Sequence, residues 1–345
     1  MAAREHRGVI NLSLDQVEDL SRRALEACGA SAINAAPVAD SMREAEAQGI
    51  RNVGLAYLPT YCEHLRIGKV DGTAVPIMTR TAPAAIAVDA VFGFAHPAFL
   101  LALDEHLAMA ETAGVAVLAI RRSYSAGVVG WFVEHIARRG LVGLAFANAS
   151  AVMPPTGGSV PVFGTDPLGF AAPRAGRPPI VLDMATSATA RVNVIHAAEA
   201  GGPIPDGWAL DAHGRPTTDP DAALAGMMAP LGGYKGSGLA LMVEVLAAAL
   251  TGSRFSFEAS SLLDDAGGPP GIGQLFISLA PSLVGGDTFA TRIEMLAAAL
   301  DQPGARLPGD RRHEARQRAE REGVEVPDRL HAQLENYASS PGAMR

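Results

Sequence analysis

The stretch "PPIVLDMATSATA", residues 178–190, combines two features that limit the choice of fold. Its apolar run IVLDM predicts a buried strand. The residues that follow are small or carry hydroxyls, which suits close approach of the backbone to a ligand. The chain nevertheless has no G-x-G-x-x-G after a strand and no G-x-x-x-x-G-K-[ST], so neither a Rossmann fingerprint nor a P-loop is expected.

The composition describes a folded, acidic chain. Of its 345 residues 48% are hydrophobic and 19% charged, so most of the chain should fold around a sizeable core. The formal net charge is −8, and Lys and Arg do not cluster before the tail, which argues against nucleic-acid binding. The nine histidines lack metal-ligand spacing, so we expect no metal site. We expect Cys28 and Cys62 to be reduced, buried thiols.

Hydrophobic spacing predicts alternating helices and short strands. A capping box at Ser13 begins the first helix, and Pro97 begins a long helix that ends near Gly114. The almost wholly apolar run 238–250 is too short to cross a bilayer and predicts a buried core helix. No signal-peptide pattern opens the chain, so we expect a soluble cytoplasmic protein. The predicted helices are 13–28, 35–48, 97–114, 129–139 and 238–250, and the predicted strands are 115–120, 141–148 and 180–184.

Five motifs follow one another along the chain: "GTDPLGF" (164–170), "VLDMATSATA" (181–190), "IPDGWALDAHGRPTTDP" (204–220), "PLGGYKGSGLAL" (230–241) and "LPGDRRHEARQRAEREGV" (307–324). Together they resemble the malate/L-lactate dehydrogenase family of the second type. That family includes ureidoglycolate and sulfolactate dehydrogenases and the reductases of Δ1-piperideine-2-carboxylate and Δ1-pyrroline-2-carboxylate. The resemblance covers nearly the whole chain. It implies an α/β (α+β) protein with a non-Rossmann NAD(P)-binding fold, a large mainly antiparallel sheet, a helical domain and a homodimer.

On this basis we expect three regions. Residues 1–75 should form an N-terminal helical segment that carries substrate-site residues. Residues 76–310 should form the mixed α/β core that binds NAD(P). Residues 311–345 should form a helical tail that returns to the N-terminal domain.

The resemblance also implies which residues contact the cofactor. The segment 183–189 matches the part beside the nicotinamide, ribose and phosphates, and the two later motifs add a second and a third contact. The residue chemistry agrees, because the hydroxyls can hydrogen-bond, the alanines allow close approach and Lys235 offers a cation for phosphate. Arg311 and the neighbouring Arg312 slightly favour NADPH over NADH. The expected cofactor contacts are Ser123, Thr165, Asp183, Met184, Ala185, Thr186, Ser187, Ala188, Thr189, Tyr234, Lys235, Gly309, Asp310 and Arg311.

The stretch "GIRNVGLAYLPTY", residues 49–61, departs from the family where a proton donor is expected. Family members usually read Ser-His-Gly there, with the histidine as donor to the developing alkoxide, whereas this chain has Asn-Val-Gly at 52–54. A second family motif, Ser-x-His-Phe-Gly, appears as Ser-Tyr-Ser-Ala-Gly at 123–127. The Leu-Pro pair at 58–59 keeps the frame. Both expected histidines are therefore replaced, by Val53 and Ser125.

Three functions remain open. A ketone needs a proton as hydride arrives, whereas a cyclic imine can be protonated beforehand, so loss of the histidine costs an imine reductase less. We therefore expect NAD(P)H-dependent reduction of Δ1-pyrroline-2-carboxylate or Δ1-piperideine-2-carboxylate to proline or pipecolate. A 2-hydroxy acid dehydrogenase of the malate, lactate or ureidoglycolate kind, with Tyr57 as the acid, is the alternative. The third possibility, a relative that binds the cofactor without turnover, explains the retained cofactor motifs less well.

Each candidate site residue also has an ordinary structural role open to it. Asn52 suits either a hydrogen bond to the imine nitrogen or a turn, and Arg51 either a substrate carboxylate or an exposed loop. Tyr57 and Tyr61 suit packing and substrate contact equally. A carboxylate that ends a buried strand needs a partner, which favours a role beside the nicotinamide over a helix cap. The expected catalytic residues are Asn52, Tyr57 and Asp183, and the expected substrate contacts are Arg51, Tyr61 and Ser125.

Overall fold

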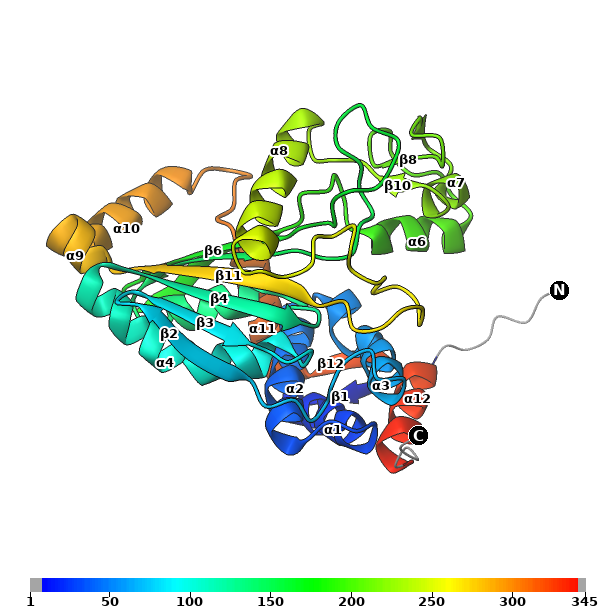
Figure 1. The fold of residues 1–345 in the computed structure, drawn as a ribbon, viewed down its shortest axis with the longest axis horizontal. Helices are drawn as coiled ribbons and strands as arrows, with labels where there is room; N and C mark the ends of the chain where they lie inside the picture. The colour runs from blue at the N-terminus through cyan, green and yellow to red at the C-terminus, as the bar shows by residue number, and fades with distance from the viewer. Residues whose placement is uncertain (1–7, 341–345) are drawn as a thin grey trace.

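A seven-stranded mixed sheet lies at the centre of the computed structural model, which describes residues 8–340 (Figure 1). Its strand order is β2-β3-β4-β11-β5-β6-β7. The pair β3–β4 is parallel, and the other neighbouring pairs are antiparallel. The strands are β2 (Ile77–Ala82), β3 (Ala85–Asp89), β4 (Val115–Ser123), β5 (Val142–Ala147), β6 (Leu168–Arg174), β7 (Arg177–Met184) and β11 (Ile272–Leu279). The expected combination of helices and a large sheet is confirmed.

Two apolar helices cover one face of this sheet. Helix α4 (Ala95–Ala113) begins close to the predicted Pro97 and ends before Gly114, which adopts the left-handed conformation typical of a C-terminal glycine. Helix α5 (Val129–Ala137) buries Trp131, Phe132 and Val133. These side chains and those of α4 form the largest core cluster with the inner residues of β3, β4 and β5. Burial of that many apolar side chains fixes the helices on the sheet.

The opposite face carries α8 (Tyr234–Val243), which continues into the π-helical segment η3 (Glu244–Ala249) (Figure 1). The prediction of a buried core helix over 238–250 is wrong. Val243 and Ala247 pack on Phe146 and Leu275 of the sheet, but Leu241 is 56% and Leu250 64% exposed. Only one stripe of the helix meets the sheet, and within residues 8–340 no element covers the outer apolar stripe.

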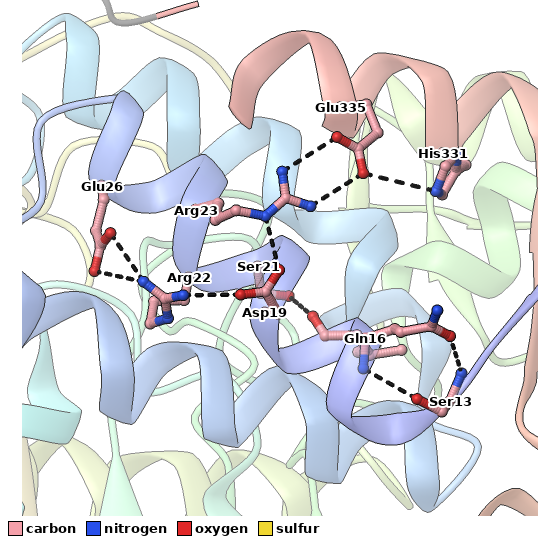
Figure 2. A network of polar contacts seen from close by, with 10 residues as sticks. Ser13, Gln16, Asp19, Ser21, Arg22, Arg23, Glu26, His331 and Glu335 are labelled. Atoms are coloured by element: carbon pink, nitrogen blue, oxygen red, sulfur yellow. Dashed lines mark hydrogen bonds and ion pairs between the residues drawn. The ribbon is translucent and has the colours of Figure 1, made fainter. Parts of the chain in front are cut away.

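The two ends of the described chain pack together. Strand β1 (Val9–Leu12) pairs antiparallel with β12 (Val324–Pro327), and α1 (Leu14–Ala27) packs against α12 (Asp328–Ser339). Figure 2 shows Arg23 between Asp19 and Glu335, with the Arg23 guanidinium 3.1 and 3.2 Å from the Glu335 carboxylate oxygens. The predicted capping box at Ser13 is present (Figure 2). Together these contacts hold the tail helices beside the first helix, although the domain boundaries proposed above stay a prediction.

The remaining elements form three groups. Helices α2 and α3 lie beside α1. Helix α2 begins three residues earlier than predicted, at Ala32, and includes Pro37 in its second turn, where proline removes one hydrogen bond of the helix. A three-stranded sheet with α6 and α7 forms a small lobe, and α9 to α11 follow β11 (Figure 1). The bounds are α2 (Ala32–Ala47), η1 (Arg51–Val53), η2 (Leu55–Tyr57), α3 (Leu58–Arg66), α6 (Arg191–Ala200), β8 (Ala209–Leu210), β9 (Pro216–Thr217), α7 (Pro220–Leu224), β10 (Met227–Met228), α9 (Pro281–Gly285), η4 (Gly286–Thr288), α10 (Phe289–Leu300) and α11 (Asp310–Glu322).

Three local features of the described residues concern the cysteines, membrane crossing and metal binding. Cys28 and Cys62 are free and buried, as predicted. No helix in the described part of the chain has the length and apolar character needed to cross a membrane. Between residues 8 and 340, no three His, Cys, Asp or Glu side chains are grouped so as to hold a metal ion.

Candidate active site

The turn after β7 is hydrogen-bonded to two other segments that carry proposed cofactor motifs, one around residue 165 and one around residue 230. The backbone N–H of Thr186 donates to Thr165 O at 2.8 Å, and the N–H of Leu231 donates to Thr186 O at 2.9 Å. A further bond of 2.8 Å runs from Ala188 N to Ala229 O. Thr186 and Ser187 are buried, and Met184, Ala185, Ala188, Thr189 and Thr165 are half-buried. The segments around 165, 186 and 230 therefore form one continuous backbone surface.

The N-terminus of α8 lies at the end of this surface. Gly232 and Gly233 adopt positive φ angles of 58° and 67°, and a Cβ atom on either would meet nothing within 4 Å. Tyr234 is 71% exposed, and Lys235 beside it is exposed as well. Free N–H groups at a helix start together with a lysine ammonium favour phosphate. The donor set in this turn therefore fits a nucleotide phosphate.

The C-terminal motif lies against β7 just before this turn. Gly309 has φ +98°, and a Cβ there would lie 3.3 Å from Val181 N, so the strand requires a small residue at this point. The Asp310 carboxylate accepts from Leu307 N at 3.0 Å and so fixes the loop. Arg311 is exposed on α11, whereas Arg312 turns towards the strand. Of the two arginines, only Arg312 has contacts to the motif at 183–189.

Asp183, the last residue but one of β7, makes polar contacts with α5 and α11. Its Oδ2 accepts from Gly130 N at 3.0 Å at the start of α5 and lies 3.4 Å from the Arg312 guanidinium. Burial raises the pKa of Asp183, and the charge of Arg312 opposes that rise. The carboxylate thus has the contacts of a helix cap, while its strand end adjoins the 185–189 turn. Its proposed catalytic role stays a prediction.

The loop 51–57 is held by a buried carboxylate. Glu46 Oε1 accepts from Leu55 N at 2.8 Å, and a Cβ on Gly54 would collide with the same carboxylate. Burial raises the pKa of Glu46. Asn52 and Arg51 are exposed, whereas Val53 is half-buried and packs against the main core.

Tyrosine side chains occupy the space between this loop and the 123–130 segment. The rings of Tyr57 and Tyr61 meet edge to face with centroids 4.9 Å apart, and Tyr124 packs on Tyr61 at 5.6 Å. Burial raises the pKa of Tyr61, which a hydrogen bond with Ser125 partly offsets. Ser125 is half-buried and accepts from Gly127 N at 3.2 Å. Tyr57, which was predicted to be catalytic, and the predicted substrate contacts Tyr61 and Ser125 are thus gathered in one place.

Ser123 differs from its neighbours because its side chain points into the sheet. It is fully buried, and its hydroxyl lies 2.7 Å from Gln274 Oε1 on β11. This gives the hydroxyl a structural partner, so the cofactor contact proposed for it stays a prediction.

Several residues at the site were not identified from the sequence. Glu46, Gly130, Tyr124 and His64 have no motif of their own, and they become visible only through contacts between distant segments. Tyr124 is the exception in part, since it lies between the proposed residues 123 and 125. The family motif Ser-x-His-Phe-Gly allows any residue at the position of Tyr124, so the motif itself did not draw attention to this tyrosine.

Comparison with known proteins gives consistent matches over almost the whole chain. A family model described as malate/L-lactate dehydrogenase matches residues 12–335. A (2R)-3-sulfolactate dehydrogenase (NADP(+)) of Chromohalobacter salexigens is 44% identical over 330 residues, covering 95% of this chain and 98% of that protein. A Δ1-pyrroline-2-carboxylate/Δ1-piperideine-2-carboxylate reductase of Pseudomonas putida is 40% identical over 334 residues, covering 95% of this chain and 97% of that protein.

Among solved structures, a crystal structure of Δ1-piperideine-2-carboxylate reductase from Pseudomonas syringae pv. tomato superposes with a TM-score of 0.91 at 40% identity, covering 95% of this chain and 99% of that chain. A sulfolactate dehydrogenase from Methanocaldococcus jannaschii gives 0.87 at 26% identity, covering 96% of this chain and 98% of that chain.

Proposed function

Because the chain belongs to the malate/L-lactate dehydrogenase family, we propose that it reduces small cyclic 2-imino acids with NAD(P)H. The substrates are Δ1-pyrroline-2-carboxylate, giving L-proline, and Δ1-piperideine-2-carboxylate, giving L-pipecolate. Relatives that are named as such reductases are about 40% identical to this chain. Because its relatives are named as reductases and dehydrogenases, the chain is an oxidoreductase. The observation that carries the choice of substrate is the apolar Val53 at the position expected to donate a proton.

The cofactor is proposed to lie along the surface formed by the three motifs, on a mainly antiparallel sheet rather than a Rossmann domain. Lys235 and the α8 N-terminus would hold phosphate, and the turn 185–189 would lie beside the ribose and nicotinamide. A bound nicotinamide supplies the hydride. NADPH is slightly favoured, because Arg311 is exposed and free of the contacts that hold Arg312 at Asp183.

The protein's own residues then orient the imine and provide a dry pocket. Val53 presents an apolar wall, and Asn52 on the same loop offers an amide to the ring nitrogen or a water. The exposed Arg51 is suited to the substrate carboxylate. Asp183 contributes a buried carboxylate at the strand end, where negative charge stabilises a protonated imine.

A second candidate function rests on a specific observation. The sulfolactate dehydrogenase of Chromohalobacter salexigens, at 44% identity, acts on a 2-hydroxy acid. Oxidation of such a substrate requires a base for the hydroxyl proton, and Tyr57 is the candidate in this site. Tyr57 is half-buried, and burial raises its pKa to about 12. That higher pKa means that Tyr57 rarely loses its proton near neutral pH, so we place this function second.

Absorbance of NADPH and NADH separates the candidates. We expect consumption of reduced cofactor with the two cyclic imino acids, and much slower consumption with pyruvate, oxaloacetate and 3-sulfopyruvate. Initial rates with each cofactor at equal concentration test the preference for NADPH. Turnover of the 2-oxo acids without turnover of the cyclic imines overturns the proposal in favour of the second candidate.

Replacing Val53 by histidine tests the apolar wall directly. We expect Val53→His to leave the imine rate unchanged or lower it by up to about tenfold, because a larger polar ring enters a position where Val53 packs against the main apolar core. The same variant should gain activity on a 2-oxo acid. Val53→Leu, which keeps the wall apolar, is the matched control. A large increase in imine turnover in Val53→His, measured as kcat, contradicts the idea that the pocket needs no acid at this position.

We also propose a homodimer, for which the exposed apolar stripe on α8 and η3 is the supporting observation. Helix α10 on the same side of the sheet adds Met295 and Leu296, which are 63% and 54% exposed (Figure 1). Patches of this kind on a folded chain mark interaction surfaces. Sedimentation velocity of the wild type and of Leu241→Glu tests the proposal, which a wild-type monomer contradicts.

A further inference from the structure

Glu46 holds both ends of the segment that carries residues 51–53. At one end its backbone carbonyl oxygen accepts from Gly49 N at 3.0 Å, in the turn that follows α2. At the other end its carboxylate oxygen Oε1 accepts from Leu55 N at 2.8 Å. A single residue therefore closes a short loop that has Asn52 in its middle.

The Glu46 side chain also lies directly against Gly54, the residue between η1 and η2. A Cβ on Gly54 would lie 2.4 Å from Glu46 Oε1, 2.9 Å from Cδ and 3.0 Å from Cγ, and these are its three nearest atoms. Gly54 N donates to Arg51 O at 3.2 Å, and Gly54 O accepts from Tyr57 N at 2.9 Å. A shift of Gly54 is therefore passed on to the turns on both sides of it.

Two buried carboxylates of α2 differ in what they hold. Glu44 is 8% exposed and forms ion pairs with Arg43 at 2.7 Å and with Arg316 of α11. Glu46 is 5% exposed, and its carboxylate bonds to the loop instead. Burial raises the pKa of both groups, so each depends on its partners to stay ionised. One carboxylate thus secures a helix and the other secures the loop.

The loop needs such support because its two polar residues lack packing of their own. Asn52 and Arg51 are exposed, so burial does not fix their direction. A group that acts on a reacting atom must be placed accurately, and an error of about 1 Å can cost roughly 10²-fold in rate. The position of Asn52 therefore depends on how the loop backbone is held.

We propose that Glu46 is a positioning residue for the reduction, which places Asn52 at the reacting nitrogen by holding Gly54 and Leu55. This inference rests on the proposed function and extends it. Glu46 acts through the loop backbone, and Asn52 is the residue at the substrate.

Glu46→Ala removes the acceptor and should lower kcat for the cyclic imines about 10- to 100-fold. The affinity for NADPH should stay as in the wild type, because the hydrogen bonds of Glu46 within residues 8–340 do not reach the segments around 165, 186 and 230. Glu46→Gln keeps an acceptor oxygen of the same reach and should retain kcat within about threefold of the wild type. Steady-state kinetics and fluorescence titration with NADPH measure the two quantities.

Gly54→Ala disturbs the same contact from the other side. Its methyl group meets the Glu46 side chain, so this variant should lower kcat as Glu46→Ala does. In the double variant the three atoms nearest to that methyl group are absent. Adding Gly54→Ala to Glu46→Ala should therefore change kcat by less than about threefold, so the two effects do not multiply.

Glu44→Ala is the matched control, since it removes a carboxylate of similar burial from the same helix. It breaks the ion pair with Arg316 and should lower the melting temperature. Its kcat and its affinity for NADPH should remain those of the wild type. A loss of stability alone would therefore not reproduce the effect expected of Glu46→Ala.

The proposal is overturned if Glu46→Ala keeps the wild-type kcat, or if Glu46→Gln loses as much activity as Glu46→Ala. It is equally overturned if NADPH affinity falls together with kcat, if Glu44→Ala loses kcat to the same extent, or if the effects at 46 and 54 multiply. Failure of the proposed function looks different, because the wild type then does not turn over cyclic imines at all. In that case the same variants are measured with 3-sulfopyruvate, and an unchanged kcat in Glu46→Ala overturns the positioning role there too.

Discussion

Gly236→Ala should lower the affinity for NADPH at least tenfold, while Gly238→Ala on the same helix should leave it intact. A Cβ on Gly236 would lie 2.4 Å from Leu231 N, 2.6 Å from Leu231 O and 2.8 Å from Thr186 O. All three are backbone atoms of the surface that joins two cofactor motifs, so they cannot move aside as a side chain does. The N–H of Gly236 also donates to Leu231 O at 2.8 Å. Alanine must therefore push the 230 segment away from the 186 turn.

The size of the effect follows from the cost of overpacking. Forcing an extra methyl group into packed backbone costs roughly 1–3 kcal/mol and occasionally more. At about 1.4 kcal/mol for each tenfold change, we expect NADPH affinity to fall at least tenfold. Fluorescence titration with NADPH measures it, and a thermal melt checks that the variant is folded.

Gly238 is the matched control because the same chemical change meets empty space. A Cβ there would find no atom within 4 Å, and alanine in a helix is favoured over glycine by roughly 0.5–1 kcal/mol. Gly238→Ala should bind NADPH as the wild type does and melt slightly higher. Equal affinities for the two variants would show that the 186–231 contact does not shape the cofactor site.

Local signals in the sequence predicted the elements that depend on local chemistry. The Ser13 capping box and the Gly114 C-terminus are satisfied within a few residues, and both were predicted correctly. Strand β11 was missed although it lies in the middle of the sheet. Its run IGQLFISL follows a Gly- and Pro-rich loop, and its partners β4 and β5 are more than a hundred residues away in sequence. Because β11 is buried on both faces over most of its length, it lacks the apolar–polar alternation that marks a half-buried strand.

The arginines of helix α11 show that the sequence alone also does not fix the direction of a side chain at the site. Residues four apart share a helix face, so Arg312 and Arg316 of α11 both point inward, to Asp183 and to Glu44. Arg311, the residue before Arg312, points to solvent. The sequence identified the motif, but it did not show which face of helix α11 points inward. Packing of the helix against α2 and β7 decides this. Motif order therefore identified segments that meet in the structure, but not which of their side chains face one another.

A buried acid pair lies just outside this surface and makes the fold sensitive to alkali. Asp166, fully buried after Thr165, shares the Ser256 hydroxyl with Glu244. One hydroxyl proton cannot donate to two carboxylates at once, and Asp166 Oδ2 has no hydrogen-bond partner within residues 8–340. Burial, followed by the charge of Glu244, therefore raises the pKa of Asp166 well above its usual value.

Asp166→Asn should raise the melting temperature by several degrees at pH 8 and change it much less at pH 5. The folded pKa is raised, so the native state holds the proton more tightly than the unfolded chain. The stability that this proton contributes is full below the unfolded pKa of about 3.9 and is lost as pH rises through the folded pKa. Each pH unit that separates the two pKa values corresponds to about 1.4 kcal/mol. Asparagine cannot ionise and also tolerates the φ of +35° at this position.

Thermal melts of the wild type and the variant from pH 5 to pH 9 measure the difference. Asp301→Asn, at an exposed aspartate, is the control and should keep the wild-type decline towards alkaline pH. If Asp166→Asn declines as steeply as the wild type, then Asp166 is already ionised in the folded protein at neutral pH. In that case the Ser256 hydroxyl and the backbone N–H of Ala149, 3.3 Å away, suffice to hold two buried charges.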